Sequence, residues 1–237
     1  MLYPRMSLQK SPKIIGTMFD QIAPKYDLVN RLTSFGQDVR WRKKLAQFIP
    51  NKPNLKLLDL ATGTGDILIT LQNKFATGIG IDLSEGMLKA GQAKLLKQNL
   101  THKITLQQGD ATALPLPNES TDIITMAFGI RNVEHVPKAL SEMYRTLAPN
   151  GRVLILEFSL PSNWFIRHGY LLYFRHILPL IGGLISGNKK AYSYLNQSVE
   201  SFPYGENFLA LLKDAGFTNT QGHKLCFGVA TIYQGDK

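Results

Sequence analysis

The chain has 237 residues, of which 44% are hydrophobic and 19% are charged. This balance is that of an ordinary globular protein, with enough material for one large α/β domain and its core. A single cysteine, Cys226, excludes an internal disulfide and offers no cysteine-based metal cluster, so we expect a reducing compartment and no metal. Residues 1–13 lack the apolar core of a secretory signal, and we therefore expect a cytoplasmic protein.

The net charge of +10 is unevenly distributed along the chain. Residues 1–53 contain ten Lys and Arg against three acids, residues 54–160 contain ten of each, and residues 161–237 contain seven against four. The basic excess therefore lies outside the central section. A basic surface is typical of contact with nucleic acid, an anionic membrane or an acidic substrate, while a merely solvated surface carries the same charges.

Two helical patterns are predicted before the first strand. Within residues 14–31 the apolar residues between 14 and 22 follow a helical spacing, which Pro24 then interrupts. Residues 38–49 form an amphipathic helix whose polar side is basic. Packing on the domain with the charges in water is the first interpretation of this helix, and a membrane-surface or phosphate-facing helix is the second.

Residues 56–67, KLLDLATGTGDI, combine a short apolar strand, a turn of small residues and the start of a helix. This order is the first half of a βαβ unit, in which free backbone N–H groups face a bound nucleotide. A dinucleotide fingerprint requires a third glycine where this chain has Leu68, so the NAD interpretation weakens. The remaining pattern resembles motif I of the S-adenosylmethionine (AdoMet) methyltransferases, and we expect Gly63, Thr64 and Gly65 to bind the donor.

Two acids follow the next predicted strands. Asp82 ends the strand at 77–83, seventeen residues beyond the last turn glycine, close to the spacing of a carboxylate that binds ribose hydroxyls. Its alternative role is a turn or a helix cap. Asp110 follows the strand at 104–108, where its carboxylate can accept from the adenine amine and the Ala111 N–H can reach a ring nitrogen. The alternative for Asp110 is an Asx turn.

The rest of the pattern completes a sheet. Residues 122–126 predict a fourth strand, and the loop 128–133, FGIRNV, should overhang the site because ligands bind over the carboxyl ends of parallel strands. The other predicted elements are helices at 67–74, 85–98, 138–146, 192–201 and 207–214, a turn at 149–151, a fifth strand at 152–158, and an antiparallel pair of strands at 217–220 and 226–234.

Residues 164–186 are the most apolar part of the chain. Arg167, Arg175 and Pro179 interrupt the run, so we do not interpret it as a membrane-spanning helix. Two interpretations stay open: a helix that lines the core, and a lid whose apolar face meets a lipophilic substrate or the bilayer surface.

Several longer stretches match one family in the same order and at the same distances. On these stretches the chain resembles the UbiE/MenG (COQ5-like) quinone C-methyltransferases over nearly its whole length. The matching pieces are MFDQIAPKYDLVNRLTSFG (18–36), LDLATGTGD (58–66), DLSEGML (82–88), GDATALPLP (109–117), FGIRNV (128–133), EMYRTLAPNGRVLILEFS (142–159) and AYSYLNQSVESFPYGENF (191–208). LDLATGTGD recurs in many methyltransferases, whereas FDxxAxxYD, FGIRN and SYxYLxxSVxxFP are much more specific.

The resemblance implies an α/β fold, a Rossmann-like class I AdoMet-dependent methyltransferase with a mostly parallel seven-stranded sheet and an antiparallel C-terminal strand. It implies a single domain with a helical N-terminal cap (1–53), an AdoMet-binding core (54–160), a substrate-side helical insertion (161–216) and a C-terminal strand pair (217–237). Its donor would be AdoMet. Its acceptor would be a polyprenylated quinol ring, either demethylmenaquinol in menaquinone biosynthesis or, as the alternative, 2-methoxy-6-polyprenyl benzoquinol in ubiquinone biosynthesis.

The same resemblance implies partners and donor contacts. A lipophilic acceptor implies peripheral contact with the inner face of the plasma membrane; no nucleic-acid partner is expected, and a homodimer stays open. Thr64 would lie near the carboxylate end of AdoMet, Asp82 at the ribose, and Asp110 with Ala111 at the adenine. Ala127 stands where relatives commonly have serine, so only a backbone contact is expected there.

Two departures from the family pattern lie farther along the chain. Asn150 replaces a glycine of the usual turn, and asparagine tolerates the left-handed conformation that such a turn requires. Residues 187–190 stand where many relatives have an acidic residue, which leaves substrate contacts there open.

The chemistry requires a nucleophilic ring carbon, because the methyl group of a sulfonium is already activated. Loss of a proton from a quinol hydroxyl places negative charge on the oxygen and on the neighbouring ring carbon. Our hypothesis is that Arg131 and Asn132 hold this oxygen as an anion-stabilising pair, and that Tyr26 orients the ring. Arg131 is too basic to take the proton except through a water. His135 is the second candidate base, with a helix-entry or solvent-facing role as its alternative.

Two rival functions follow from the same sequence. The charge of +10 prompts an RNA methyltransferase, but the sequence has no basic tract with interleaved aromatics, no appended RNA module and no NPPY-type motif. The other rival is a non-catalytic AdoMet-fold partner in a quinone-synthesis complex, against which the intact glycine turn and its acids argue.

Overall fold

A seven-stranded sheet forms the centre of the computed structural model, which describes residues 10–186 and 189–237. The strand order is β3-β2-β1-β4-β5-β7-β6; β1 to β5 are parallel, and β7 runs antiparallel to both of its neighbours. This arrangement confirms the predicted fold class. The strands are β1 (Lys56–Leu60), β2 (Thr77–Asp82), β3 (Ile104–Gln108), β4 (Thr121–Ala127), β5 (Leu147–Phe158), β6 (Thr218–Leu225) and β7 (Ala230–Asp236).

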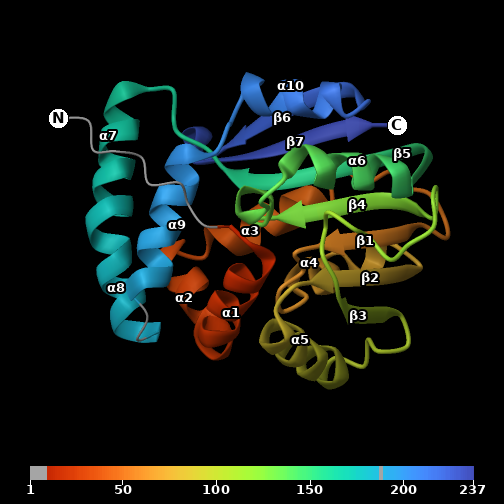
Figure 1. Ribbon diagram of the computed structural model, residues 1–237, viewed down its shortest axis with the longest axis horizontal. Coiled ribbons are helices and arrows are strands. Elements are labelled where there is room, and N and C mark those ends of the chain that lie inside the picture. The colour runs from red at the N-terminus through yellow and green to blue at the C-terminus, as the bar shows by residue number, and fades with distance from the viewer. Residues whose placement is uncertain (1–9, 187–188) are drawn as a thin grey trace.

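Helices cover both faces of this sheet (Figure 1). On one face the apolar sides of α6 (Val136–Thr146) and α10 (Glu206–Asp214) pack on β1, β4 and β5. On the other face α3 (Gln37–Leu45), α4 (Asp66–Thr70) and α5 (Glu85–Lys97) contribute to a second core cluster. Because both faces are buried, the central strands are mostly apolar on both sides and lack the alternation of a half-exposed strand, with a few buried polar residues such as Asp59 and Thr125.

A third group of helices lies beyond the carboxyl ends of the parallel strands. Figure 1 shows this layer on the left, the side toward which the arrowheads of β1 and β4 point. It brings together segments that are far apart in sequence, and Val29, Phe174 and Val199 belong to its core. The layer consists of α1 (Pro12–Ile22), a 3₁₀ turn (Ala23–Lys25), α2 (Tyr26–Thr33), α7 (Trp164–Leu172), α8 (Leu178–Ser186) and α9 (Lys189–Ser201).

The apolar segment predicted at 164–186 is nearly continuous helix. A π-helical turn (Tyr173–Ile177) joins α7 to α8. Phe174 and Leu178 are buried against the cap, whereas Leu184 is 81% exposed. The segment therefore lines the interior with one side and presents apolar side chains on the other. Residues 187–188, which belong to the family departure noted above, lie outside the described residues.

Several helix and strand boundaries differ from the sequence prediction; the strand predicted at 217–220, for example, is Thr218–Leu225. The helix predicted at 38–49 ends at Leu45, and the one predicted at 67–74 shortens to α4 with a 3₁₀ turn (Gln72–Lys74) after it. The turn predicted at 149–151 lies inside β5, because Asn150 takes a φ of 62° and a register shift in the pairing with β4 absorbs the bend. The strand predicted at 226–234 begins only at residue 230.

The late start of β7 has a local cause. Cys226 and Phe227 have φ values of 46° and 58°, so the chain turns back at Cys226–Gly228 instead of extending. The apolar pattern over these residues resembles a strand, but their side chains belong to a turn beside the helical layer. Phe227 is 80% exposed there.

Candidate active site

The turn after β1 brings backbone N–H groups to the carboxyl end of the sheet. Gly63 and Gly65 have φ values of 56° and 77°, and Ala61 has a φ of 48°, so the turn depends on left-handed conformations. The Gly65 N–H donates to the Thr62 carbonyl oxygen at 2.9 Å, and α4 starts immediately afterwards. The strand–turn–helix order predicted from the sequence is thus present.

The loop after β4 packs directly on this turn. A Cβ built on Gly129 would lie 2.5 Å from the Cβ of Ala61, closer than two carbon atoms can approach without a shift. Only a residue without a side chain fits at position 129 while alanine occupies position 61. The loop therefore overhangs the glycine turn, as expected from the strand order.

A cavity of about 100 Å³, here called the donor cavity, lies between the glycine turn, the ends of β2 and β3, and the loop after β4. Helix α1 closes its other side with Ile15 and Phe19. The residues proposed for the donor that line it are Gly63, Asp82, Asp110, Ala111 and Ala127. Thr64 and Gly65 do not line it.

Two of the acids that line the donor cavity, Asp82 and Asp110, are already partly bonded to the backbone. Asp82 accepts from the N–H groups of Gly63 and Ser84, both at 2.8 Å, so its carboxylate is held against the glycine turn. Burial raises the pKa of Asp82, and these backbone N–H groups oppose the rise. Asp110 accepts from the N–H and the hydroxyl of Thr112, which is the Asx turn given above as its alternative role, yet it also lines the cavity.

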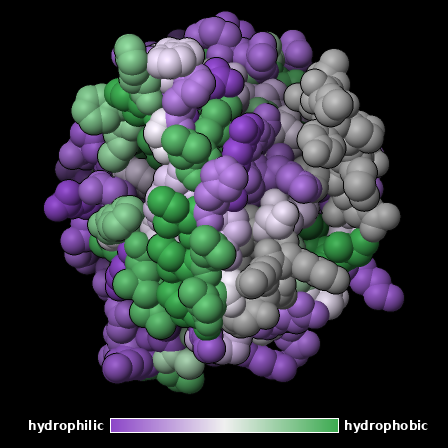
Figure 2. Space-filling model, turned by 90° about the vertical axis from the view of Figure 1, so that its left-hand side faces the viewer, coloured by the Kyte–Doolittle hydropathy of each residue, from purple (hydrophilic) through white to green (hydrophobic). Residues whose placement is uncertain are grey.

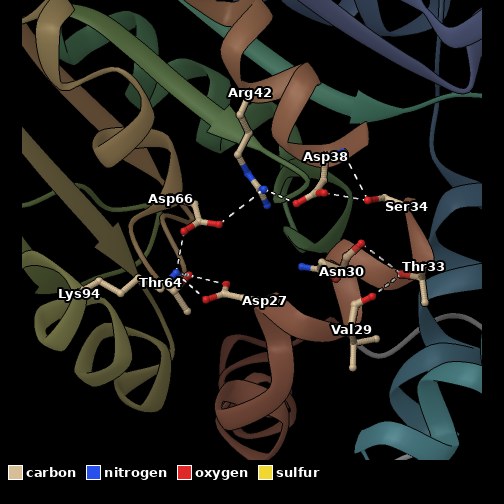
Figure 3. Close-up of polar contacts among 10 residues, drawn as sticks. All are labelled: Asp27, Val29, Asn30, Thr33, Ser34, Asp38, Arg42, Thr64, Asp66 and Lys94. Carbon is tan, nitrogen blue, oxygen red and sulfur yellow. Dashed lines mark hydrogen bonds and ion pairs between the residues drawn. The ribbon is translucent and has the colours of Figure 1, made fainter. Parts of the chain in front are cut away.

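Thr64 takes part in an ionic network beneath the turn rather than in the cavity wall. Figure 3 shows its hydroxyl, which donates to Asp27 at 2.8 Å and accepts from Lys94 at 2.7 Å. Lys94 also pairs with Asp27 at 2.5 Å and with Asp66 at 2.6 Å. The predicted contact of Thr64 with the donor therefore depends on its backbone.

The same network continues into the N-terminal helices. Asp66 pairs with Arg42 at 3.5 Å, and Arg42 pairs with Asp38, its neighbour one turn earlier on α3. Arg42 and Asp38 are buried, with exposures of 7% and 4%. Charges that are paired in this way fix the orientation of α2 and α3 relative to the glycine turn, because an unpaired buried charge is costly.

A larger cavity of about 340 Å³, here called the acceptor cavity, lies between the helical layer and the loop after β4. A chain of ring contacts forms much of its wall: Trp41 with Phe128 at 6.0 Å, Phe128 with Phe158 at 4.6 Å, and Phe158 with Phe174 at 5.9 Å between centroids. Such a wall suits a flat apolar ring and an alkyl chain. Four residues line both cavities: Phe19, Tyr26, Phe128 and Asn132.

Tyr26 lies at the boundary between the two cavities. Its ring carbon Cε1 is 4.0 Å from the place that a Cβ on Gly63 would occupy, so the ring stands over the glycine turn. Burial raises the pKa of Tyr26, and a hydrogen bond with the side chain of Asn30 opposes the rise. At neutral pH the phenol therefore stays protonated and can donate.

Arg131 lines the acceptor cavity and is held by Glu157, a residue that the sequence reasoning missed. Its Nη1 donates to Glu157 Oε1 at 2.7 Å and to the Phe128 carbonyl oxygen at 2.6 Å. Glu157 is fully buried at the end of β5, and burial raises its pKa while Arg131 opposes that rise. A lone acid at the end of the apolar strand RVLILEF, beside the strand that leads to Arg131, was the available signal.

Asn132 and His135 occupy different positions in the site. Asn132 lines both cavities, and its Nδ2 donates weakly to the Phe128 carbonyl oxygen at 3.4 Å. His135 lines only the donor cavity, at the N-cap position of α6 and without a side-chain capping bond. The geometry thus brings Tyr26, Arg131 and Asn132 to the acceptor cavity and leaves His135 on the donor side.

The outer surface of the helical layer is rich in apolar side chains. Figure 2 shows this face, with hydrophobic groups gathered among hydrophilic ones. The exposed large apolar residues of its helices and turns include Leu28, Leu32, Phe35, Trp164, Phe165, Leu172, Ile177, Leu180 and Leu184. No helix in the described part of the chain has both the length and the apolar character to cross a bilayer.

Comparisons with known proteins agree with these features. The model of the ubiE/COQ5 methyltransferase family matches residues 6–237. A "Ubiquinone/menaquinone biosynthesis C-methyltransferase UbiE" of Geotalea daltonii is 44% identical over 94% of this chain and 96% of its own. A "Demethylmenaquinone methyltransferase" of Thermus thermophilus is 44% identical over 93% of this chain and 100% of its own.

Solved structures support the fold. A crystal structure titled as a SAM-dependent methyltransferase, possible histamine N-methyltransferase, from Thermotoga maritima has a TM-score of 0.66 at 20% identity and covers 94% of this chain and 99% of its own. The [4+2]-cyclase SpnF has a TM-score of 0.65 at 15% identity, covering 95% and 96%. Because these identities are low and the two titles differ in chemistry, the likeness concerns the fold alone.

Proposed function

The chain belongs to the ubiE/COQ5 methyltransferase family and is a methyltransferase, and from this premise we propose that it methylates a ring carbon of a prenylated quinol with S-adenosylmethionine as donor. Demethylmenaquinol is the first candidate acceptor, and a methoxy polyprenyl benzoquinol is the second. The observation that carries the proposal is the pair of adjoining cavities, a small one over the glycine turn and a larger aromatic one, which share Tyr26 and Asn132.

The donor cavity is proposed to hold the adenosine part of AdoMet. Asp82 would accept from the ribose hydroxyls with the lone pairs that Gly63 and Ser84 leave free, and Asp110 with the Ala111 N–H would bind adenine. Ala127 has no hydroxyl to offer, so its contribution is a backbone contact. The charged sulfonium would then lie toward Tyr26 and Asn132, where the two cavities meet.

Arg131 and Asn132 are proposed to stabilise the quinol oxygen that loses its proton. The guanidinium is oriented by Glu157 and by the Phe128 carbonyl, and it packs over the Phe158 ring at 5.4 Å. A fixed cation in a water-poor cavity lowers the energy of an adjacent phenolate, which raises the electron density on the neighbouring ring carbon. Arg131 does not itself accept the proton, which would leave through a water; His135, on the donor side, is the second candidate base.

Positioning contributes the remaining part of the barrier reduction. Tyr26 would orient the acceptor ring so that the nucleophilic carbon lies in line with the C–S bond of the donor. Alignment of two bound reactants is worth about 7–11 kcal/mol in favourable cases, and the reaction needs no covalent intermediate. We further propose that residues 1–53 and 161–216 act as the cover that excludes water from this junction, because described residues of both segments line the acceptor cavity, among them Trp41 and Tyr170.

Analysis of the quinone pool after gene deletion tests the acceptor. Accumulated demethylmenaquinone would support the first candidate, and a demethylated benzoquinone precursor would support the second. With the purified full-length chain, the matching assay follows methyl transfer from labelled AdoMet to short-prenyl naphthoquinol or benzoquinol under reducing conditions. An unchanged quinone pool, together with no transfer to either ring, would refute the proposal.

We also propose that the apolar outer surface of the helical layer rests on an anionic bilayer. Phe165 and Leu184 are 77% and 81% exposed, and α7 and α8, which carry them, also line the acceptor cavity. The chain segments of this layer, residues 12–33 and 164–201, contain seven Lys and Arg against three acids, an excess that favours anionic lipid. A prenyl tail would then leave the cavity toward the bilayer.

Vesicle co-sedimentation tests this contact. The chain should bind vesicles containing anionic lipid more strongly than neutral ones, and Phe165→Ser with Leu184→Ser should weaken binding. Leu96→Ser is the matched control, because Leu96 is 64% exposed on α5, outside the layer. Equal loss in the control, or no vesicle binding by the unaltered chain, would contradict the proposal.

A further inference from the structure

The acceptor cavity has an unusual concentration of unsatisfied polar atoms. Within the residues that the structure describes, seven buried side-chain nitrogen and oxygen atoms lack a hydrogen-bond partner. Four of them belong to residues that line this cavity: Arg131 Nε, Asn132 Oδ1, Tyr170 OH and Tyr194 OH. Because buried polar groups are nearly always paired, such clustering in one cavity indicates a ligand that supplies the partners.

These four residues come from three elements that are distant in sequence. Arg131 and Asn132 belong to the 3₁₀ turn Ile130–Asn132 after β4, Tyr170 to α7 and Tyr194 to α9. Ring contacts hold Tyr170 in place: it stacks on Phe174 at 5.0 Å, and Phe174 packs edge-on against Phe158 at 5.9 Å, the ring below Arg131. The hydroxyl of Tyr170 is thus positioned by the same aromatic wall that supports the guanidinium.

The two tyrosines differ from Asn132 in the cavities that they line. Asn132 lines both cavities, whereas Tyr170 and Tyr194 line only the acceptor cavity. A quinol ring carries two oxygens on opposite sides. If Asn132 and Arg131 hold the oxygen beside the reacting carbon, the opposite oxygen extends away from the donor, into the part of the cavity that the two tyrosines line.

We propose that Tyr170 and Tyr194 bind the second oxygen of the acceptor ring, so that the cavity recognises a ring with two opposed oxygens and not a simple phenol. This inference rests on the proposed function. Holding one oxygen leaves the ring free to rotate about that contact, whereas holding both fixes which ring carbon faces the methyl group. Tyr170 and Tyr194 are therefore specificity-determining residues.

The electrostatics of the two hydroxyls suit this role. Burial raises the pKa of Tyr194 to about 12 and that of Tyr170 further, and Arg131 opposes both shifts from nearby. Both phenols therefore remain protonated at neutral pH. Each can donate one hydrogen bond to the far oxygen and accept one from its hydroxyl.

The test compares two acceptors that differ by one oxygen. One is a short-prenyl naphthoquinol kept reduced without air, and the other is the matching naphthol that keeps only the hydroxyl beside the carbon to be methylated. Dissociation constants are measured with the full-length chain in the presence of S-adenosylhomocysteine, where no methyl transfer occurs and ring reactivity cannot contribute. We expect the chain to bind the quinol at least about tenfold more tightly than the naphthol.

Tyr170→Phe and Tyr194→Phe should each reduce this preference by about three- to tenfold, and the double variant should approach equal binding. Tyr173→Phe is the matched control, because Tyr173 also lines the cavity but its hydroxyl already donates to the Thr33 carbonyl oxygen at 2.7 Å. Whatever this control does to absolute affinity, it should keep the unaltered preference. A purely structural role of Tyr170 or Tyr194 would weaken both ligands alike.

The outcomes separate this inference from the function on which it rests. Methylation of the quinol with an unaltered preference in both tyrosine variants would overturn the inference and leave the function standing. Equal binding of quinol and naphthol by the unaltered chain would do the same without any variant, even if the variants failed to fold. Absence of quinol methylation by the unaltered chain would overturn both.

Discussion

The donor and acceptor cavities share four wall residues, yet their remaining walls consist of different kinds of residues and structural elements. The donor cavity is walled mainly by turns that follow consecutive strands, with backbone groups and short side chains such as Gly63, Asp82 and Ala111. The acceptor cavity is walled by bulky rings from distant parts of the chain, among them Trp41 of α3, Phe158 at the end of β5 and Tyr194 of α9. A local motif can specify the first, whereas only the assembled helical layer creates the second. Substitutions on each side should therefore affect different ligands.

Replacement of Arg131 should give the largest effect and should be confined to the acceptor side. Arg131→Gln removes the proposed stabilising charge, and turnover should fall by about 10²–10³-fold. AdoMet affinity should change little, because Arg131 lines only the acceptor cavity. Turnover is measured with a saturating donor, and donor affinity by calorimetry.

The matched control for Arg131 is Arg40→Gln, since Arg40 is exposed on α3 and lines neither cavity. It should retain both turnover and donor affinity. Near-normal turnover in Arg131→Gln would remove this residue from the mechanism. A parallel loss of donor affinity would show that the two cavities are not separable in the way described.

The Arg131–Glu157 pair should also dominate the stability of the acceptor side. Arg131→Gln or Glu157→Gln alone leaves one buried charge uncompensated, which should cost about 3–5 kcal/mol of unfolding free energy. The double variant should lose much less than the sum of the two, because neither charge remains. Urea unfolding of all four forms gives the coupling energy. Additive losses would contradict the view that the carboxylate and the guanidinium compensate each other.

Replacement of Asp82 should give the complementary effect on the donor side. Asp82→Ala removes the proposed ribose acceptor, and the dissociation constant for AdoMet should rise by about 10–100-fold. Quinol binding without donor should stay within about twofold. Asp214→Ala, at an exposed position on α10, is the control that should leave both ligands unaffected. An unchanged donor affinity in Asp82→Ala would show that this acid forms the turn and does not bind the donor.

The smallest effect concerns Asp59, a buried acid of β1 that accepts from Thr62 and Thr125, both at 2.6 Å. Burial raises its pKa from 3.8 to about 7. Between pH 4 and 7 the folded state therefore keeps a proton that the unfolded chain has released, so stability falls as pH rises through this window. Relative to Asp59→Asn, which cannot titrate, the loss should be on the order of 1.4 kcal/mol for each pH unit of this window.

Urea unfolding of both proteins from pH 4.5 to pH 8 measures this difference. The gap between the unaltered chain and Asp59→Asn should change from pH 4.5 to about pH 7 and level off toward pH 8. A constant gap would mean that Asp59 is ionised throughout. The pKa of Asp59 in the folded state would then not be raised by burial.

Sequence patterns predicted the parts of the molecule that depend on neighbours in the chain. The strand at 104–108 has the predicted bounds, and the glycine turn, the acid at the end of β2 and the overhanging loop are where strand alternation and turn chemistry put them. These features need only local geometry and the rule that parallel strands end at one edge. The strand–turn–helix order followed from the same signals, whereas the full seven-stranded fold was implied by the family resemblance.

The parts that the sequence did not reveal depend on contacts between distant segments. Glu157 seemed one more strand residue until the structure brought it to Arg131, and Tyr170 and Tyr194 gain meaning only because α7 and α9 meet over the loop after β4. Thr64 shows the reverse case. Its position in the turn was evident from the sequence, but its hydroxyl is hydrogen-bonded to Asp27 and Lys94. No local sequence pattern predicts these two contacts.

The close contact between Gly129 and Ala61 leaves space for a methyl group at only one of the two positions. The two single substitutions should differ in their effect on the structure. Ala61→Gly removes a methyl group at a position whose φ of 48° suits glycine. Gly129→Ala instead adds a methyl group that forces the loop away from the turn. Made together, the two changes would transfer the methyl group from one side of the contact to the other. An alanine at position 129 is therefore expected only where position 61 is already glycine.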